Sequence, residues 1–212
     1  MTPDPVHFEV RLAASADDRR AAERLRYRVF VEELGGDGPL IDHVNRAERD
    51  EFDAVADHLL LIDTRRDAAT LDHVVGVYRL MTDAHAAAIG RFYCDSEYDL
   101  TPLRASGRRL LELGRSCMDR GYRGGSGMFL MWNALAAYVL ERGLEIMFGV
   151  ASFHGTDAAA LAMPLAWLHH HHLAPEGLRP VAWPDGYQRM DLVPPGALDR
   201  KQAMAAMPAL IK

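Results

Sequence analysis

Apolar and polar positions in the first part of the chain follow two different periods. Residues 7–13 alternate between apolar and polar side chains, which is the pattern of a half-buried strand. Ser15 can then cap a helix, with Asp18 completing an approximate capping box. Apolar residues continue at helical spacing up to the glycines at 35–36, where we expect the helix to end. A polar stretch rich in carboxylates follows over residues 36–56.

The middle of the chain has the pattern of a sheet. Apolar runs over residues 58–64 and 73–81, separated by a polar turn, predict an antiparallel hairpin. Residues 110–118 predict a further strand, and a glycine-rich turn follows it. The apolar segment 128–142 then predicts a long helix that ends at Gly143.

The last third of the chain predicts two strand-forming regions and two helices. In order, we expect a buried strand, a helix capped by Thr156 or Asp157, a hairpin turning at residues 184–186, and a short tail helix. These elements cover residues 145–152, 157–170, 180–193 and 198–211, respectively.

The order of elements, β-α-β-β-β-α-β-α-β, is typical of an α+β fold with three layers, in which helices flank a central mixed sheet. The sequence has no internal repeat and no long low-complexity linker. We therefore predict a single domain over residues 1–212, with its core at about residues 8–195 and a C-terminal tail over residues 196–212.

Composition places the chain among ordinary globular proteins. Hydrophobic residues make up 49% and charged residues 25% of the sequence, and the net charge of −6 argues against a general nucleic-acid-binding protein. The first residues, MTPDPVHFEV, have no signal-peptide pattern, and no apolar run reaches the roughly 20 residues that span a bilayer. The two cysteines make no disulfide framework, so we expect a protein of the reducing cytoplasm.

Positive charge is nevertheless concentrated in two places. Six arginines lie between residues 104 and 123, against only Glu112 and Asp119, and a second cluster lies over residues 19–28. Basic patches on an acidic protein suggest that an acidic partner docks at a defined place, and solvated helix and loop faces are the alternative. The glycine-rich turn over residues 122–127 could place a ligand phosphate at the N-terminus of the following helix, or it could simply begin that helix.

Several short motifs occur in an order that resembles one family. They are RYRVFVEE at 26–33, EFD at 51–53 with DHL at 57–59, GVYRL at 76–80, ELGRSC at 112–117 and FGVASFHGTD at 148–157. The chain resembles the ornithine–acyl carrier protein N-acyltransferases of bacterial ornithine-lipid synthesis, which are GNAT-fold relatives of the acyl-homoserine-lactone autoinducer synthases. The resemblance extends from about residue 8 to about residue 183, and the last motif resembles the ornithine branch.

The resemblance implies transfer of a (3-hydroxy)fatty acyl group from acyl carrier protein to the α-amine of L-ornithine, without a further cofactor. The general GNAT pyrophosphate loop would have glycines at 126 and 128 if Arg123 began it, and this chain has Ser126 and Met128. That departure suits a donor carried on the phosphopantetheine of a carrier protein better than coenzyme A. The basic residues would then bind the acidic carrier protein. The expected carrier and pantetheine contacts are Arg108, Arg109, Arg120, Arg123, Gly124, Gly125 and Ser126.

The resemblance places Glu112 beside the thioester as the general base, since the acceptor amine is protonated at neutral pH. Partial desolvation there would raise the pKa of the glutamate. A structural carboxylate paired with Arg115 or Arg79 is the alternative. Strict strand alternation puts Glu112 and Arg115 on opposite faces, so they share a pocket only if the strand bulges near Gly114. A backbone N–H freed by such a bulge could polarise the thioester oxygen.

The acceptor carries two cationic amines and one carboxylate. By resemblance, Glu32, Asp53 and Asp57 line its site, and Arg28 or Arg79 pairs with its carboxylate. An exposed helix face and ordinary loop or cap roles are the alternatives for these residues. The acyl chain needs an apolar tunnel, and plain core is the interpretation that we favour over a tunnel wall for each of the aromatic candidates Phe30, Phe92, Trp132 and Phe148.

Two other signals do not predict a site. The histidines at 169–172 point in different directions on a helix, so we expect no metal site. Cys117 has no histidine partner at a recognisable spacing, and direct transfer needs no covalent step, so we interpret it as a small buried residue.

Two other functions stay open at this stage. One is an autoinducer synthase, which would accept S-adenosylmethionine, and the other is a non-catalytic module that binds an acyl carrier or a lipid surface. The lipid product and the apolar tail residues Met204, Met207, Leu210 and Ile211 also suggest peripheral contact with the inner face of the membrane.

Overall fold

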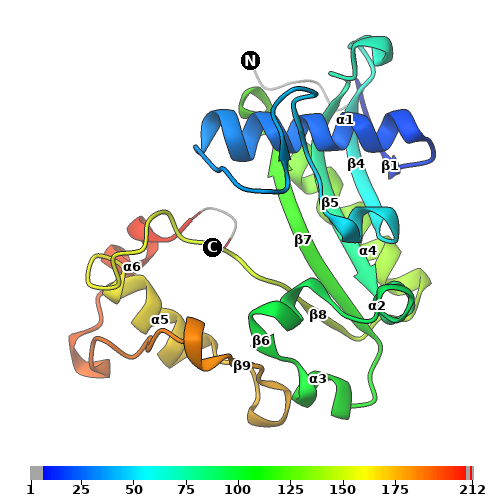
Figure 1. Ribbon diagram of the computed structural model, residues 1–212. Coiled ribbons are helices and arrows are strands. Elements are labelled where there is room, and N and C mark those ends of the chain that lie inside the picture. Colours follow the sequence, from blue (N-terminus) through cyan, green and yellow to red (C-terminus); the bar gives the residue numbers. More distant parts are fainter. Residues whose placement is uncertain (1–6, 209–210, 212) are drawn as a thin grey trace. The chain divides into compact units, whose positions relative to one another are not determined.

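The computed structural model describes residues 7–208 and 211 (Figure 1). The chain forms two compact units. The first contains the chain up to Tyr93 together with Arg109–Phe148, and the second contains Cys94–Arg108 together with the chain from Gly149 onwards. The organisation as a single domain stays a prediction.

The first unit is built around a mixed sheet of five strands in the order β1-β4-β5-β7-β8. All neighbouring pairs are antiparallel except β7 and β8, which are parallel. The predicted hairpin of β4 and β5 and the predicted strand β7 are confirmed. The strand bounds are Phe8–Leu12 for β1, Asp57–Asp63 for β4, Val74–Thr82 for β5, Leu110–Met118 for β7 and Ile146–Phe148 for β8. Two short strands, β2 (Ile41–Asp42) and β3 (Ala47–Glu48), pair separately.

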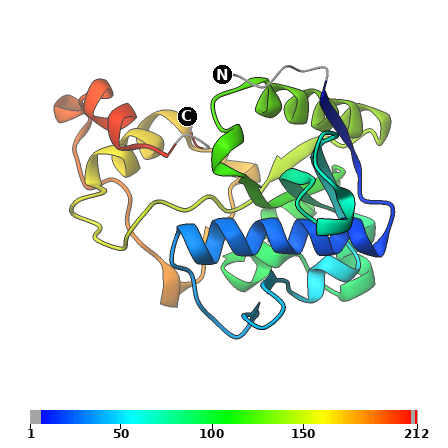
Figure 2. The ribbon, with the colours of Figure 1, turned by 90° about the horizontal axis from the view of Figure 1, so that it is seen from above.

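Two helices cover the opposite faces of this sheet (Figure 2). Helix α1 (Ala16–Arg26) starts at the predicted capping box of Ser15 and Asp18 and continues as a π-helix over Tyr27–Glu33. It packs on Leu60 and Val77, among others. Helix α4 (Ser126–Glu141) packs on the opposite side chains of the same strands, which include Leu59 and Leu80. The alternation of apolar residues along β4 and β5 therefore builds one core on each face, and the predicted three layers are confirmed in this unit.

A short helix, α2 (Asp83–Ile89), follows β5 directly. The second unit contains α3 (Thr101–Ala105), α5 (Ala162–His172) and α6 (Arg200–Ala206), and α5 packs against α6. Its only strand pair in the described part of the chain joins β6 (Tyr98–Asp99) to β9 (Val181–Ala182). Short 3-10 turns lie at Glu51–Ala54, Ala68–Thr70, Tyr93–Ser96, Arg120–Tyr122, Glu176–Leu178, Pro184–Gly186 and Pro195–Ala197.

The sequence-based elements beyond residue 144 are partly wrong. The predicted buried strand 145–152 shortens to β8, where Met147 is 49% exposed. Helix α5 begins at Ala162 rather than at 157, because Asp157 caps an isolated turn by accepting the N–H groups of Ala159 and Ala160. These differences shorten both elements without removing them.

The predicted hairpin over residues 180–193 is absent. Residues 181–182 pair instead with residues 98–99, and the expected turn at Pro184–Gly186 forms a 3-10 turn. A partner so distant in sequence leaves no local signal. The tail helix is shorter than predicted and, of the tail residues named for membrane contact, Leu210 lies outside the described residues. No helix in the described ranges is long and apolar enough to cross a membrane.

Candidate functional site

Strand β7 carries the bulge predicted near Gly114. Val77 of β5 pairs with Cys117, and Arg79 pairs with Gly114, so two residue steps on β5 oppose three on β7. Arg115 absorbs the extra residue with a φ of 49°, in the left-handed region. The bulge places Arg115 on the same side of the sheet as Glu112, as the argument from alternation required. The strained position is the arginine rather than the glycine beside it.

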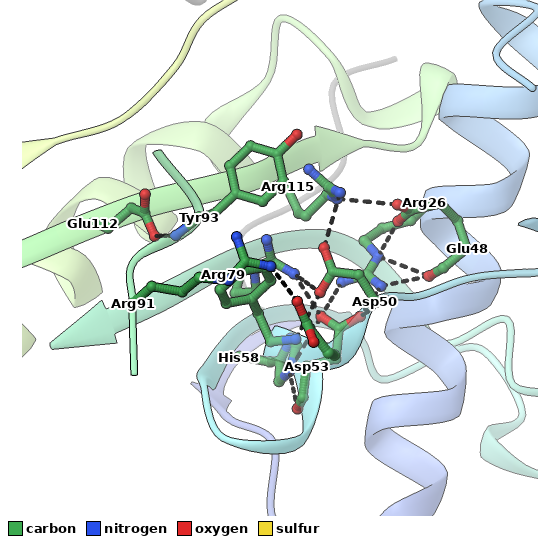
Figure 3. A network of polar contacts seen from close by, with 12 residues as sticks. Arg26, Glu48, Asp50, Asp53, His58, Arg79, Arg91, Tyr93, Glu112 and Arg115 are labelled. Carbon is green, nitrogen blue, oxygen red and sulfur yellow. Dashed lines mark hydrogen bonds and ion pairs between the residues drawn. The ribbon is translucent and has the colours of Figure 1, made fainter. Parts of the chain in front are cut away.

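Beneath α1, three arginines and three carboxylates form a buried network (Figure 3). Arg26 donates from its two Nη atoms to the carboxylate oxygens of Asp53 at 2.7 and 2.6 Å. Arg79 donates to Asp53 at 3.1 Å and also to Asp50. The network continues to β7, where Arg115 donates to Glu48 at 3.0 Å and to Asp50 at 2.9 Å.

The network balances three positive and three negative charges in the interior. Arg26 is 0% and Arg79 2% exposed. Burial is the largest single influence on Asp53 and opposes its ionisation. The hydrogen bonds from Arg26, together with the charges of Arg26 and Arg79, outweigh it and hold the pKa of Asp53 well below its usual range. Burial likewise opposes the charge of Arg26, and its contacts with Asp53 raise the pKa of Arg26 above its usual value. Nε2 of His58 donates to the backbone carbonyl oxygen of Asp53 at 3.2 Å, and burial lowers the pKa of His58.

Tyr93 joins this network to Glu112. Its backbone N–H donates to Oε2 of Glu112 at 2.9 Å, and Glu112 itself is 3% exposed. The ring of Tyr93 lies under two guanidinium groups, with its centroid 4.8 Å from Cζ of Arg115 and 5.6 Å from Cζ of Arg79. Glu112, which the sequence predicts as the base, is therefore held by a backbone hydrogen bond beside the ionic network (Figure 3).

The five residues predicted for the acceptor site are not gathered at one place. Arg79 and Asp53 are already paired inside the network, and Glu32 pairs with Arg46 at an exposed position. Asp57 lies on the α4 side of the sheet, where it accepts the hydroxyl of Tyr138 at 2.9 Å. Asp53 and Asp57 therefore belong to opposite faces.

Arg28 lies at the other end of β7 from Glu112. Its Nη1 binds Asp72, its Nη2 is 3.6 Å from Asp119, and its Nε and Nη2 have no hydrogen-bond partner among the described residues. Asp119 follows Glu112 by seven positions along an extended strand, roughly 20 Å. That distance exceeds the length of an ornithine molecule whose amine reaches Glu112, so the structure does not support Arg28 as the partner of its carboxylate.

The residues predicted to bind the acyl donor do not all lie at one place. Arg123 pairs with Glu33 and donates to the Met118 carbonyl at 3.0 Å, and Arg120 is exposed beside it in sequence. Arg109 belongs to the first unit and Arg108 to the second. Of the two other arginines of the stretch, Arg104 pairs with Asp95 in the second unit, and Arg115 is held inside the ionic network. The six arginines are therefore not all available to one basic surface.

The N-terminus of α4 has the form expected of an anion site. Gly124 has a φ of 80°, and Gly125 is the N-cap without any side-chain cap. The hydroxyl of Ser126 is buried without a hydrogen-bond partner among the described residues. Within residues 7–208, no capping side chain accepts from the first N–H groups of α4, and the helix dipole favours an anion there.

One edge of β7 is also open. The parallel pairing with β8 covers only Leu110, Leu111 and Glu112. From Leu113 to Met118, no strand in the described part of the chain pairs with that edge. An extended ligand could add to the sheet along these residues.

The structure also places the cysteine and the aromatic residues that the sequence analysis discussed. Cys117 packs against the core under α1, and burial raises its pKa to about 12, which leaves a neutral thiol. Phe92 is 2% exposed and meets Phe148 edge-on at 5.1 Å, as core residues do. Trp132 is 44% exposed, so it does not line an enclosed tunnel.

The histidines at 169–172 do not converge either. His171 lies against the Trp167 ring with 4.2 Å between ring centroids, and His170 contacts the Val193 carbonyl at 3.1 Å. Over the ranges that the structure describes, no three His, Cys, Asp or Glu side chains are grouped as metal ligands.

The sequence motifs missed part of this site. Arg26, Glu48, Asp50 and Tyr93 were not predicted as functional residues. A signal for Arg26 was present, because it lies at helical spacing with Ala22 on the apolar face of α1. A charge on a buried face requires a counter-charge.

Comparisons with known proteins agree on the family. Residues 25–133 match the acetyltransferase (GNAT) domain. An L-ornithine N(alpha)-acyltransferase of Rhodobacter capsulatus is 66% identical over 212 residues, which cover 100% of this chain and 81% of that protein. A protein of the same name from Brucella abortus is 42% identical over 207 residues, which cover 97% of this chain and 74% of that protein. Among solved structures, the CoA-dependent acyl-homoserine lactone synthase BjaI is 18% identical with a TM-score of 0.49, covering 82% of this chain and 81% of that one.

Proposed function

The chain belongs to the L-ornithine N(alpha)-acyltransferase family of GNAT-fold proteins, and from that membership we propose that it transfers a fatty acyl group from acyl carrier protein to the α-amine of L-ornithine. The product would be N-acyl-ornithine, the lyso form of an ornithine lipid. The observation that carries the acceptor and the reaction is the 66% identity to a relative of that name along the whole chain. No cofactor beyond the donor's own phosphopantetheine takes part.

Features at the end of β7 and the start of α4 support a carrier-protein donor. The uncapped N-terminus of α4 suits one phosphate, that of phosphopantetheine, and the residues at 126 and 128 depart from the glycines of a coenzyme A pyrophosphate loop. The open edge of β7 from Leu113 to Met118 suits the extended amides of the pantetheine arm. The exposed Arg120 suits an acidic carrier protein.

In the proposed reaction, Glu112 takes one proton from the α-ammonium group, directly or through a water molecule. The amine nitrogen then attacks the carbonyl carbon of the thioester, the carbon–sulfur bond breaks, and the second proton lost by the nitrogen goes to the departing thiolate. The products are the amide and the free phosphopantetheine thiol. The proton on Glu112 returns to solvent.

Other groups of the site hold the reacting groups in place. The Tyr93 N–H orients the Glu112 carboxylate, and the bulge at Arg115 turns backbone N–H groups of β7 out of the regular ladder, where one of them could stabilise the negative thioester oxygen. Arg115 and Arg79 hold this geometry through the buried carboxylates, so we assign them a positioning role.

The test is mass spectrometry of the products formed with 3-hydroxyacyl carrier protein or the matching coenzyme A ester, each offered with ornithine, lysine or S-adenosylmethionine. We expect N-acyl-ornithine, formed faster from the carrier protein. An acyl-homoserine lactone would make the chain an autoinducer synthase. Absence of product from a folded protein with every pair of substrates would leave a non-catalytic binding module.

A further inference from the structure

Helix α4 exposes an apolar face that nothing in the reaction uses. The helix has no charged residue between Ser126 and Leu140. Its inner side chains, such as Met131 and Leu135, are 1% exposed in the core. On the outer side, Phe129 is 66%, Trp132 44% and Leu140 79% exposed. Asn133, Ala136 and Ala137 complete this row at helical spacing, so the row contains a single polar side chain.

A face of this kind is unusual on a protein that meets only water. Isolated exposed apolar residues are ordinary, but a continuous row with two aromatic rings marks an interaction surface. Arginines flank the helix in sequence, with Arg120 and Arg123 before it and Arg142 directly after it. Arg142 lies 3.8 Å from Glu141 and Arg123 pairs with Glu33, so Arg120 is the flanking arginine without an ion pair among the described residues.

The pattern is that of a helix lying flat in a membrane interface. Aromatic and aliphatic side chains on one face enter the boundary between headgroups and acyl chains, while arginines at the ends reach the phosphates. The acidic carrier protein is a poorer match, because an uncharged row offers it no counter-charge. We propose that the outer face of α4 binds the surface of a phospholipid membrane, with Phe129, Trp132 and Leu140 as the inserted side chains.

The choice of a lipid surface rests on the proposed function, whose product carries a fatty acyl chain and must reach a membrane. The surface can nevertheless be tested without any reaction. A protein that binds vesicles but has no activity would contradict only the proposed reaction. A protein that is active but does not bind vesicles would contradict only the membrane-binding face.

Two single-tryptophan proteins give a matched pair, because Trp132 is 44% and Trp183 45% exposed. The first keeps Trp132 and carries Trp167→Phe and Trp183→Phe, and the second keeps Trp183 and carries Trp132→Phe and Trp167→Phe. Each is mixed with vesicles of phosphatidylcholine and phosphatidylglycerol whose acyl chains are brominated. We expect strong quenching of Trp132 only. Quenching of neither, or of both equally, would overturn the assignment to α4.

A second experiment measures partition onto vesicles by co-sedimentation. The change Phe129→Ser with Trp132→Ser should lower the partition coefficient by roughly tenfold or more, since each ring carries on the order of 100 Å² of apolar surface. Val44→Ser is the control, because Val44 is 93% exposed elsewhere. Added salt should lower the partition coefficient by a modest factor only, because the flanking arginines contact lipid phosphates but the inserted row of α4 is uncharged.

The same double variant also tests a protein partner. If light scattering without lipid showed a dimer that the double variant abolishes, the face would be an interface between two copies and the membrane proposal would be wrong. If acrylamide did not quench Trp132 in the lipid-free protein, the face would already be covered by protein. The membrane proposal would then also be wrong.

Discussion

Replacing Arg26 by methionine should destabilise the first unit strongly. Arg26→Met retains an unbranched apolar stem and removes the guanidinium group that donates to Asp53 and pairs with Glu48. The position is 0% exposed, so water cannot take the place of the lost guanidinium without opening the core. Neither carboxylate is left alone, however: Asp53 keeps Arg79 at 3.1 Å and Glu48 keeps Arg115 at 3.0 Å.

The size of the effect follows from this partial compensation. Removing one member of a buried ion pair costs about 3–5 kcal/mol, and the remaining partners place this change near the lower end, about 3 kcal/mol. For a chain of this size, that corresponds to a drop in Tm of roughly 6–12 °C.

The loss should also depend on pH, with a defined sign. The folded-state pKa of Asp53 is depressed, so its contribution to stability is fully present above the unfolded-state pKa of about 4 and is lost as the pH falls below it. In the variant, protonation of Asp53 relieves an unbalanced charge. The difference in free energy of unfolding between parent and variant should therefore shrink as the pH falls from about 5 to about 3.

The assay is urea unfolding followed by the fluorescence of Trp132 in the protein that keeps only this tryptophan, because Trp132 belongs to the first unit. Arg46→Met is the control: it breaks the exposed pair with Glu32 and should change stability by no more than about 0.5 kcal/mol. The reasoning is refuted if Arg26→Met costs no more than Arg46→Met, or if the difference between parent and variant grows on acidification.

Three further predictions concern the proposed reaction. Glu112→Gln should lower kcat by about 10²–10⁴-fold, while Glu32→Gln at an exposed position should leave kcat unchanged; equal activity of the two variants in the mass-spectrometric assay would exclude Glu112 as the base. Cys117→Ala should keep activity within about twofold, and in a Cys94→Ala protein the alkylation rate of Cys117 should still be rising at pH 10, because its pKa is about 12; a plateau near pH 8 would contradict this. Arg120→Gln should raise KM for the carrier-protein donor several-fold at low salt without changing kcat, and high salt should abolish the difference; an unchanged KM would exclude Arg120 from carrier binding.

The elements that could be predicted from the sequence are those with a local pattern. The hairpin of β4 and β5, strand β7 and helix α4 are each an apolar segment of suitable length bounded by polar or glycine-rich turns, and the structure confirms them. Strand β9 could not be found in this way, because two residues at 181–182 pair with two at 98–99 and neither pair stands out from its neighbours. Pairing across such a distance is a property of the folded chain rather than of any window of sequence.

The site likewise has one feature that the sequence pattern predicts and others that depend on the fold. Strand alternation alone required a bulge if Glu112 and Arg115 were to share a face, and the bulge is present. Which carboxylates surround the arginines was not predictable, since residues 36–56 offer many of them at no regular spacing. Only the fold selects Glu48, Asp50 and Asp53 from this set.

The interleaving of the two units sets an order of events during synthesis. The chain leaves the first unit at Cys94 and returns to it at Arg109, so strands β1, β4 and β5 emerge from the ribosome before this excursion and β7 emerges after it. Strand β6, within the excursion, must wait about 80 residues for β9, which takes on the order of 4–16 s at ordinary elongation rates. During that interval Leu100 and Leu103, which are 1% and 3% exposed in the finished protein, lack the later part of their unit. The nascent chain thus carries an incomplete apolar segment while the rest of its first unit can already fold, and this interval is where early binding by a chaperone would have the greatest effect on yield.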